Sequence, residues 1–202
     1  MTNKLASGVT IRRARPSDAP SIARLIGLFA DQALMLRRTP AMVELAIDDY
    51  VVGVDARDNV VACGALKEYS PSVAEVAAIA VSPDAHGRGV GKAIVAAVEA
   101  LAIKRDIFDV FALTLQPEFF AAIGYERVDR ARYPEKIRRD CLACSRRFAC
   151  NETCFAKNLK LEPKSATAEA SPAAGGEGVG TPGAASAAPS RNGRALTVVS
   201  AA

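Results

Sequence analysis

The feature that most constrains the fold is an apolar segment that runs through a glycine-rich stretch into a second apolar segment. Residues 73–81 read VAEVAAIAV, which scarcely alternates between apolar and polar side chains and therefore predicts a strand buried on both faces. The stretch SPDAHGRGVGK follows at residues 82–92, and a long helix is expected from there to about Lys104. A buried strand that leads into a helix in this way is typical of α/β proteins.

The remaining segments complete an α/β domain. Residues 22, 25, 26 and 29 are apolar and have the spacing of one buried helical face, and a second, shorter helix is expected at 41–47. The further expected strands lie at 9–13, 50–54, 60–66, 108–115 and 125–128, with a short helix at 117–123. This order, βααβββαβαβ, predicts a single α/β domain with a mixed sheet flanked by helices.

Composition sets the boundaries of this domain within the 202 residues. We expect a flexible N-terminus at 1–8 and a folded unit at 9–161 that includes a cysteine-rich segment at 140–154. Residues 162–202 are rich in Ala, Gly, Pro and Ser and contain no aromatic residue, which predicts a disordered C-terminal tail.

Charge and hydropathy exclude several classes of protein. Lys and Arg number 26 against 22 Asp and Glu, and this net charge of +4 is too small to indicate nucleic-acid binding. The most apolar helical stretch, at 94–103, is interrupted by Glu99, so no membrane span is expected. The N-terminus lacks the apolar core of a secretory signal, so we expect a cytoplasmic protein with reduced or metal-bound cysteines.

The glycine-rich loop predicts a site for a phosphate-containing ligand. Glycines allow close approach of the backbone, and the free N–H groups at the start of the next helix stabilise anionic oxygens. Neither common nucleotide fingerprint fits, because Lys92 takes the place of the third Rossmann glycine and Ala93 that of the P-loop hydroxyl. The alternative is a glycine-rich connection that binds nothing. The candidate binding residues are Ile79, Ala80, Val81, His86, Gly87, Arg88, Gly89, Val90, Gly91 and Lys92.

The stretch VSPDAHGRGVGKAIV resembles the acetyl-CoA-binding motif of the GCN5-related N-acetyltransferases. Their loop reads Arg/Gln-x-x-Gly-x-Gly/Ala, with which His86, Gly89 and Gly91 align, although His86 replaces the usual Arg or Gln. The resemblance implies a splayed sheet and acetyl-CoA as cosubstrate. It also implies that the pantetheine arm pairs with the strand end at Ile79–Val81. We expect the main role of His86 to be in the structure of the loop.

A second resemblance indicates which compound accepts the acetyl group. The chain from about Val9 to Asn158 is similar to the short, stand-alone amino-acid N-acetyltransferases of bacterial arginine biosynthesis, which act as N-acetylglutamate synthases. The matching segments are Leu34–Arg38, Cys63–Leu66, Leu113–Thr114, Phe119–Phe120, Gly124–Tyr125, Pro134–Lys136 and Asp140–Cys144. The resemblance implies L-glutamate as the acceptor and leaves monomer and homodimer both open.

Acetyl transfer requires a deprotonated amine, a polarised thioester carbonyl and a leaving thiolate. Similar enzymes place a Glu where this chain has Glu75, which we expect to be the general base; its alternative is a solvated carboxylate at a strand end. Main-chain N–H groups near Ile79 and Ala80 are expected to polarise the carbonyl. The usual acidic Tyr is replaced by Phe120, which leaves water or Thr114 to assist the thiolate, while Tyr125 is expected in the core.

A dicarboxylate acceptor needs cations to bind it. Arg38, Lys67 and Lys136 are the cations on segments that border the acceptor in similar proteins. Arg38 is the strongest candidate, because a guanidinium binds a carboxylate through two parallel hydrogen bonds. The alternative for each of them is an ordinary solvated charge.

Four cysteines lie close together in the sequence, and their function has three readings. Their number suits a tetrahedral metal site, but their spacing is unusual for zinc or an iron–sulfur cluster. Redox-sensitive thiols and reduced structural cysteines are the other readings, and the site prediction therefore contains no metal. The cysteines concerned are Cys141, Cys144, Cys150 and Cys154.

The predicted function is acetyl transfer from acetyl-CoA to the α-amino group of L-glutamate in a ternary complex, the first step of arginine biosynthesis. One alternative keeps the fold and changes the acceptor to another amino acid, a small amine or a protein N-terminus. An alternative from another class is a non-catalytic acetyl-CoA or metal sensor, in which Phe120 reflects lost chemistry.

Overall fold

The structure is a computed structural model that describes residues 3–160 and 198–199. Its strands are β1 (Asn3–Lys4), β2 (Thr10–Arg13), β3 (Tyr50–Val54), β4 (Val60–Ser70), β5 (Val73–Val81), β6 (Asp109–Thr114), β7 (Glu126–Arg127), β8 (Thr153–Asn158) and β9 (Val198–Val199). Its α-helices are α1 (Ala19–Ala30), α2 (Pro40–Leu45), α3 (Val90–Lys104), α4 (Pro117–Ala122) and α5 (Pro134–Lys136), and a π-helical turn follows at Ile137–Cys141.

The strands form one mixed sheet in the order β1-β2-β3-β4-β5-β6-β8-β7, and β9 pairs with β5 beside this path. The β5–β6 pair is parallel, and the other pairs are antiparallel. The connection from β5 to β6 runs through α3, as a parallel pair requires. The expected single α/β domain with a mixed sheet is therefore confirmed.

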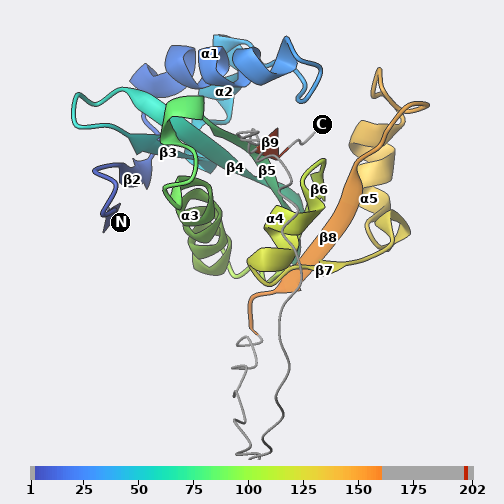
Figure 1. Cartoon of the computed structure of the whole chain (residues 1–202). Coiled ribbons are helices and arrows are strands. Elements are labelled where there is room, and N and C mark those ends of the chain that lie inside the picture. The colour runs from blue at the N-terminus through green and yellow to red at the C-terminus, as the bar shows by residue number, and fades with distance from the viewer. Residues whose placement is uncertain (1–2, 161–197, 200–202) are drawn as a thin grey trace, which may run out of the picture.

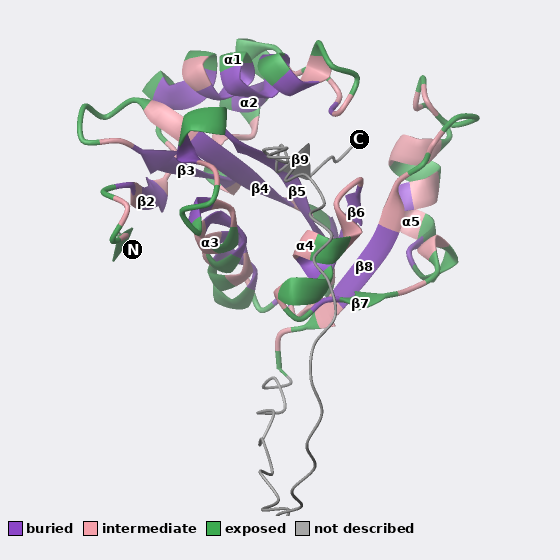
Figure 2. Cartoon of the chain, viewed as in Figure 1, coloured by how far each residue is buried: buried purple, intermediate pink, exposed green. Residues whose placement is uncertain are grey.

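Helices cover both faces of the sheet (Figure 1). Helix α1 packs on one face, where its apolar stripe buries Ile22, Ile26 and Phe29 against side chains that include Val52 and Cys63. Helix α3 packs on the opposite face. Figure 2 shows that β4 and β5 are buried along most of their length, whereas the outer surfaces of both helices are exposed. The central strands are therefore apolar on both faces, which explains why their sequences do not alternate.

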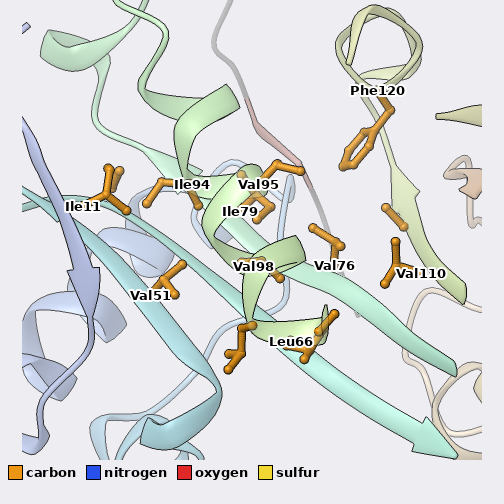
Figure 3. Close-up of a cluster of buried hydrophobic side chains, with 14 of the residues drawn as sticks. Ile11, Val51, Leu66, Val76, Ile79, Ile94, Val95, Val98, Val110 and Phe120 are labelled. Carbon is orange, nitrogen blue, oxygen red and sulfur yellow. The ribbon is translucent and has the colours of Figure 1, made fainter. Parts of the chain in front are cut away.

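The contact between α3 and the sheet depends on a close approach at Gly64. Figure 3 shows Ile94, Val95 and Val98 of α3 lying against side chains of the central strands. A Cβ atom at Gly64 would lie 2.6 Å from both Ile79 Cδ1 and Ile94 Cγ2, closer than carbon atoms approach without displacement. Glycine at this position lets α3 pack directly on β4.

Two strands lie outside the sequence-based expectations, and one expectation falls mostly outside the described residues. Strand β8 was missed, although its Cys154, Phe155 and Ala156 are buried between β6 and β7. Its short run TCFAKN has too few apolar positions for a clear period-two pattern, and pairing on both sides makes it a strand. Strand β1 pairs with β2 in the segment expected to be a flexible N-terminus. The expected disordered tail, 162–202, lies outside the described residues except for β9.

None of the helices in the described ranges, 3–160 and 198–199, is long and apolar enough to cross a lipid bilayer.

The packing at Gly64 leads to a stability prediction. Gly64→Ala is expected to lower the free energy of unfolding by about 1–3 kcal/mol, because the added methyl group must push α3 away from the sheet. The matched control is Gly27→Ala in α1, where the nearest atom to a new Cβ is the flexible Arg37 Nη1 at 3.3 Å. That variant is expected to be neutral or slightly stabilising. Urea unfolding of the three proteins measures both effects, and equal midpoints would contradict the packing argument.

Candidate functional site

Strands β5 and β6 separate soon after they begin, and this separation exposes main-chain groups. Their parallel pairing extends only from Val73–Asp109 to Glu75–Phe111, although β5 continues to Val81. The edge of β5 beyond Glu75 therefore does not pair with β6. In the structure β9 pairs with this edge at Ile79 and Ala80. The edge can therefore hydrogen-bond to an extended ligand as it does to a strand.

A β-bulge lies in the part of β5 that follows Glu75 and does not pair with β6. Between the pairs Cys63–Ala80 and Ala65–Ala77, β4 has one residue and β5 has two. Ala78 adopts a φ of +52°, which is unfavourable for a residue with a side chain, and the Cys63 thiol lies 3.5 Å from its carbonyl oxygen. The bulge turns the peptide groups of residues 78 and 79 out of the regular ladder, so it creates main-chain donors at a bend in the strand.

The glycine-rich loop ends at an uncapped helix start. Gly87 and Gly89 have φ values of +71° and +72°, and Gly89 is the N-cap residue of α3 without a side-chain hydrogen bond to the helix. The first N–H groups of a helix have no partner within the helix, and the helix dipole favours an anion there. The exposed side chains of Arg88 and Lys92 add positive charge. These features suit the predicted binding of a phosphate group, which stays a prediction.

The side chain of His86 connects the glycine-rich loop to the end of β5. Its Nε2 atom lies 2.7 Å from the carbonyl oxygen of Val81, the last residue of β5. This hydrogen bond ties the loop to the end of the strand, which agrees with the structural role expected for His86.

A depression of about 380 Å³ lies beside α2, whose Met42 is one of its lining residues. Arg38 and Lys67 both line it, so the structure brings these two predicted cations together. Its wall also includes Ala77 and the bulged Ala78. We refer to this depression as the cationic cavity. It places positive side chains beside the bend in β5.

Lys136, the third predicted cation, lies in a buried polar cluster and does not line the cavity. Its Nζ atom is 3.0 Å from Glu75 Oε2 and 3.1 Å from Asp140 Oδ2, and its side chain has no exposed surface. Tyr69 donates a hydrogen bond of 2.9 Å to Glu75 Oε2 and also contacts Asp140. Lys67 pairs with Asp140 at 2.6 Å and so links the buried cluster to the cavity.

Burial and charge set the protonation of the two carboxyl groups in this cluster. Burial raises the pKa of Glu75, although Lys136, Tyr69 and Lys67 favour its ionised form. For Asp140, burial also opposes ionisation, but hydrogen bonds from Lys67 and Tyr69 together with Lys136 lower the pKa to about 2. Glu75 Oε1 is buried without a hydrogen-bond partner among the described residues. Glu75 is therefore a more basic carboxylate than a solvated one, and the alternative of a solvated strand-end group does not hold.

The other residues considered for catalysis are also buried. Thr114 ends β6 with no exposed surface, and its Oγ1 accepts a hydrogen bond of 2.8 Å from the Gln116 N–H. Phe120 packs against Tyr125, with ring centroids 5.0 Å apart and nearly perpendicular rings. Tyr125 is 3% exposed, so the expectation that it belongs to the core is confirmed.

The cysteine-rich segment does not assemble a metal site within the described residues. No group of three or more His, Cys, Asp or Glu side chains in ranges 3–160 and 198–199 is arranged to hold a metal ion. Cys150 instead accepts a hydrogen bond from Arg130 at 3.5 Å, and Cys144 accepts one from the Arg146 N–H at 3.4 Å. Cys154 is buried in β8, where loss of hydration raises the pKa of its thiol to about 12.

Three residues of this region were missed in the sequence. Tyr69 and Asp140 connect Glu75 to Lys67, and Arg139 lines the cationic cavity. Asp140 belongs to the segment Asp140–Cys144 that matches the family, but nothing in the sequence linked it to the β4–β5 hairpin. A basic residue such as Arg139 gives no signal of its own among the other arginines of that segment.

The buried ion pair yields a prediction about stability and pH. Lys136→Met is expected to lower the free energy of unfolding by about 3–5 kcal/mol at pH 8, because it leaves the Glu75 carboxylate buried without its cation. Losing the cation raises the folded-state pKa of Glu75 further above its unfolded value of 4.5. The folded variant then binds a proton more tightly than the unfolded chain, so the deficit shrinks as the pH falls from 8 to 5.

The control is the double variant Glu75→Gln with Lys136→Met. It carries neither charge, so it is expected to be more stable than Lys136→Met at pH 8 and to lack the recovery at pH 5. Urea unfolding at both pH values measures these differences. A deficit of Lys136→Met that stays constant between pH 8 and 5 would rule out an uncompensated Glu75 charge as its cause.

Comparisons with known proteins agree with this geometry. A model of the acetyltransferase (GNAT) family matches residues 23–127. An N-acetyltransferase of Chlorobaculum tepidum is 33% identical over 154 residues, which cover 76% of this chain and 99% of that protein. An amino-acid acetyltransferase of Mycobacterium tuberculosis is 34% identical over 121 residues, covering 59% of this chain and 69% of that protein.

A solved structure extends the similarity to three dimensions. The crystal structure of N-acetylglutamate synthase from Neisseria gonorrhoeae, complexed with coenzyme A and N-acetyl-glutamate, matches with a TM-score of 0.67 and 31% identity. The match covers 75% of this chain but only 35% of that longer chain. The splayed β5–β6 pair, the uncapped start of α3, the family model and the 33% identical relative together show that the chain belongs to the acetyltransferase (GNAT) family.

Proposed function

We propose that this protein transfers the acetyl group of acetyl-CoA to the α-amino group of L-glutamate, as an N-acetylglutamate synthase in the first step of arginine biosynthesis. The observation that carries the proposal is the cationic cavity, which joins Arg38 and Lys67 to the bulged main chain at Ala77 and Ala78. The names of the similar amino-acid acetyltransferase and N-acetylglutamate synthase support it. A cytoplasmic location and a homodimer remain predictions.

Acetyl-CoA would bind along β5 and the loop that follows it. Its pyrophosphate would accept hydrogen bonds from the N–H groups at the start of α3, assisted by Arg88 and Lys92. Its pantetheine arm would pair with the edge of β5 at Ile79–Val81, where β5 no longer pairs with β6. In the structure β9 pairs with Ile79 and Ala80, so the arm would replace β9 there.

The chemical step is a direct attack in a ternary complex. The acceptor ammonium first loses a proton, and Glu75 is the base that would take it. Because Glu75 is fully buried and does not line the cavity, a water molecule would carry the proton to it. The freed amine then attacks the acetyl carbon, so the C–N bond forms and the C–S bond breaks.

The developing charges need partners in this step. Main-chain N–H groups at the bulge, near Ile79 and Ala80, would stabilise the negative charge on the carbonyl oxygen. The departing CoA thiolate would receive the second proton that the amine nitrogen loses as the amide forms, relayed by water or with weak assistance from Thr114. Phe120 has no hydroxyl group to donate one.

The acceptor assignment is tested by substitution of Arg38. Arg38→Ala is expected to raise the KM for glutamate about 10- to 100-fold, because it removes a charge-assisted pair of hydrogen bonds to a carboxylate. Arg37→Ala is the matched control, since Arg37 is the neighbouring residue, pairs with Asp31 on the surface and does not line the cavity.

The readout is mass-spectrometric detection of acetylated product with each common amino acid. A preference for glutamate that Arg38→Ala abolishes and Arg37→Ala preserves supports the proposal. Turnover of a different acceptor in place of glutamate would show that this other compound is the acceptor. Binding of acetyl-CoA without any product would indicate a protein substrate or a non-catalytic sensor.

The proposed base is tested separately. Glu75→Gln is expected to lower kcat by about 10²- to 10⁴-fold while acetyl-CoA still binds, because it removes the proton acceptor. Glu126→Gln, an exposed position in β7, is the control and should leave kcat unchanged. If both variants keep the wild-type kcat, Glu75 is not the base.

A further inference from the structure

We infer that Arg139 is a specificity-determining residue that holds the side-chain carboxylate of a dicarboxylic acceptor in the cationic cavity. The inference rests on the proposed function and extends it, because it assigns one of the two acceptor carboxylates to a residue outside the predicted site. Five observations carry it.

The local helix geometry directs Arg139 to the cavity. The turn Ile137–Cys141 is π-helical, and it ends with a hydrogen bond of 3.1 Å from the Leu142 N–H to the Ile137 carbonyl oxygen. In a π-helical turn each hydrogen bond joins residues five apart in the chain, whereas in an α-helix it joins residues four apart. Different side chains therefore share a face. Here Asp140 points toward the buried cluster, while Arg139 lines the cavity.

The guanidinium of Arg139 is held in place before any ligand binds. Its Nη1 atom donates hydrogen bonds to the carbonyl oxygens of Glu68 at 3.1 Å and Tyr69 at 3.4 Å. The centre of the guanidinium lies 5.0 Å from the centroid of the Tyr69 ring, a cation–π contact. A charged group that is already oriented loses less entropy when it binds a ligand.

Arg139 also has donors to spare. A guanidinium carries five N–H groups, and within ranges 3–160 and 198–199 no further acceptor contacts those of Arg139. Its side chain is exposed at the cavity wall. A carboxylate from outside can therefore bind to the remaining N–H groups.

The charges around the cavity single out two guanidinium groups. Four cations line it, and two of them are already neutralised: Lys67 pairs with Asp140 at 2.6 Å, and Arg105 pairs with Asp49 and Glu68 at 2.7 Å each. Arg38 and Arg139 form no ion pair with a carboxylate of the described residues. Two such groups match the two carboxylates of a dicarboxylic amino acid in number and in bonding geometry.

Exposure decides which carboxylate each arginine holds. Both arginines line the cavity, but Arg38 is half-buried, whereas Arg139 is exposed to solvent. The α-amino group must reach the acetyl carbon at the bulge, which places the neighbouring α-carboxylate inside. The side-chain carboxylate then extends outward to Arg139.

The test compares glutamate with glutamine, which lacks only the side-chain charge. Arg139→Gln is expected to raise the KM for glutamate. The ratio of kcat/KM for glutamate to kcat/KM for glutamine is therefore expected to fall about 10- to 100-fold. The kcat for glutamate and the KM for acetyl-CoA should stay unchanged. Arg139→Lys retains the charge without the planar fork and should give an intermediate ratio.

The matched control is Arg138→Gln. Arg138 is the adjacent arginine, lies exposed 3.7 Å from Glu135 and does not line the cavity, so this variant should keep the wild-type ratio. An equal loss for both acceptors in Arg139→Gln, or the same change in Arg138→Gln, overturns the inference and leaves the proposed function in place. Absence of amino-acid acetylation by the wild-type protein overturns the proposed function itself.

Discussion

The early separation of β5 from β6 is the constraint on which the rest of the site depends. A parallel strand pair normally satisfies its main-chain groups along its whole length, but this pair stops at Glu75–Phe111. Groups beyond that point need another partner, which is β9 in the structure and the pantetheine arm in the proposed complex. The bulged residue Ala78 of the same strand lines the cationic cavity. One strand thus serves both reactants of the proposed reaction.

The buried polar cluster around Glu75 sets the charges beside this strand. Glu75 is fully buried in β5, and an ionised carboxylate there is tolerable only because Lys136 and Tyr69 contact it. Asp140 accepts hydrogen bonds from both Lys136 and Lys67, so it connects the buried carboxylate to the cavity wall. These contacts join the α5 segment to the β4–β5 hairpin, two regions more than 60 residues apart in the chain. Folding and the charge state of the proposed base are therefore coupled.

Packing supports the same region from the other face. Helix α3 packs Ile94 and Val98 onto β4 and β5 where Gly64 has no side chain, and the start of this helix is the proposed anion site. The position of the loop therefore follows from the core contact, while the hydrogen bond from His86 to Val81 fixes its connection to the strand. The two proposed binding regions share this support.

Much of the fold and part of the site could be predicted from the sequence, because they depend on local patterns. The unalternating run at residues 73–81 indicated a doubly buried strand, and the glycines at 87 and 89 indicated a loop before a helix whose backbone a ligand can approach closely. Strand β8 could not be predicted, because a six-residue segment becomes a strand only through pairing on both sides. Arg38 and Lys67 were identified by resemblance, and only the structure shows that they line one cavity.

The sequence by itself determined the type and order of most elements, since helical and strand periodicity act over a few residues. Only the tertiary structure decided that Lys136 is buried against Glu75 rather than solvated, that Asp140 and Tyr69 complete this cluster, and that Arg139 reaches the cavity. The physical reason is that burial, ion pairing and pKa depend on distances between residues that are remote in the chain. No local pattern encodes those distances.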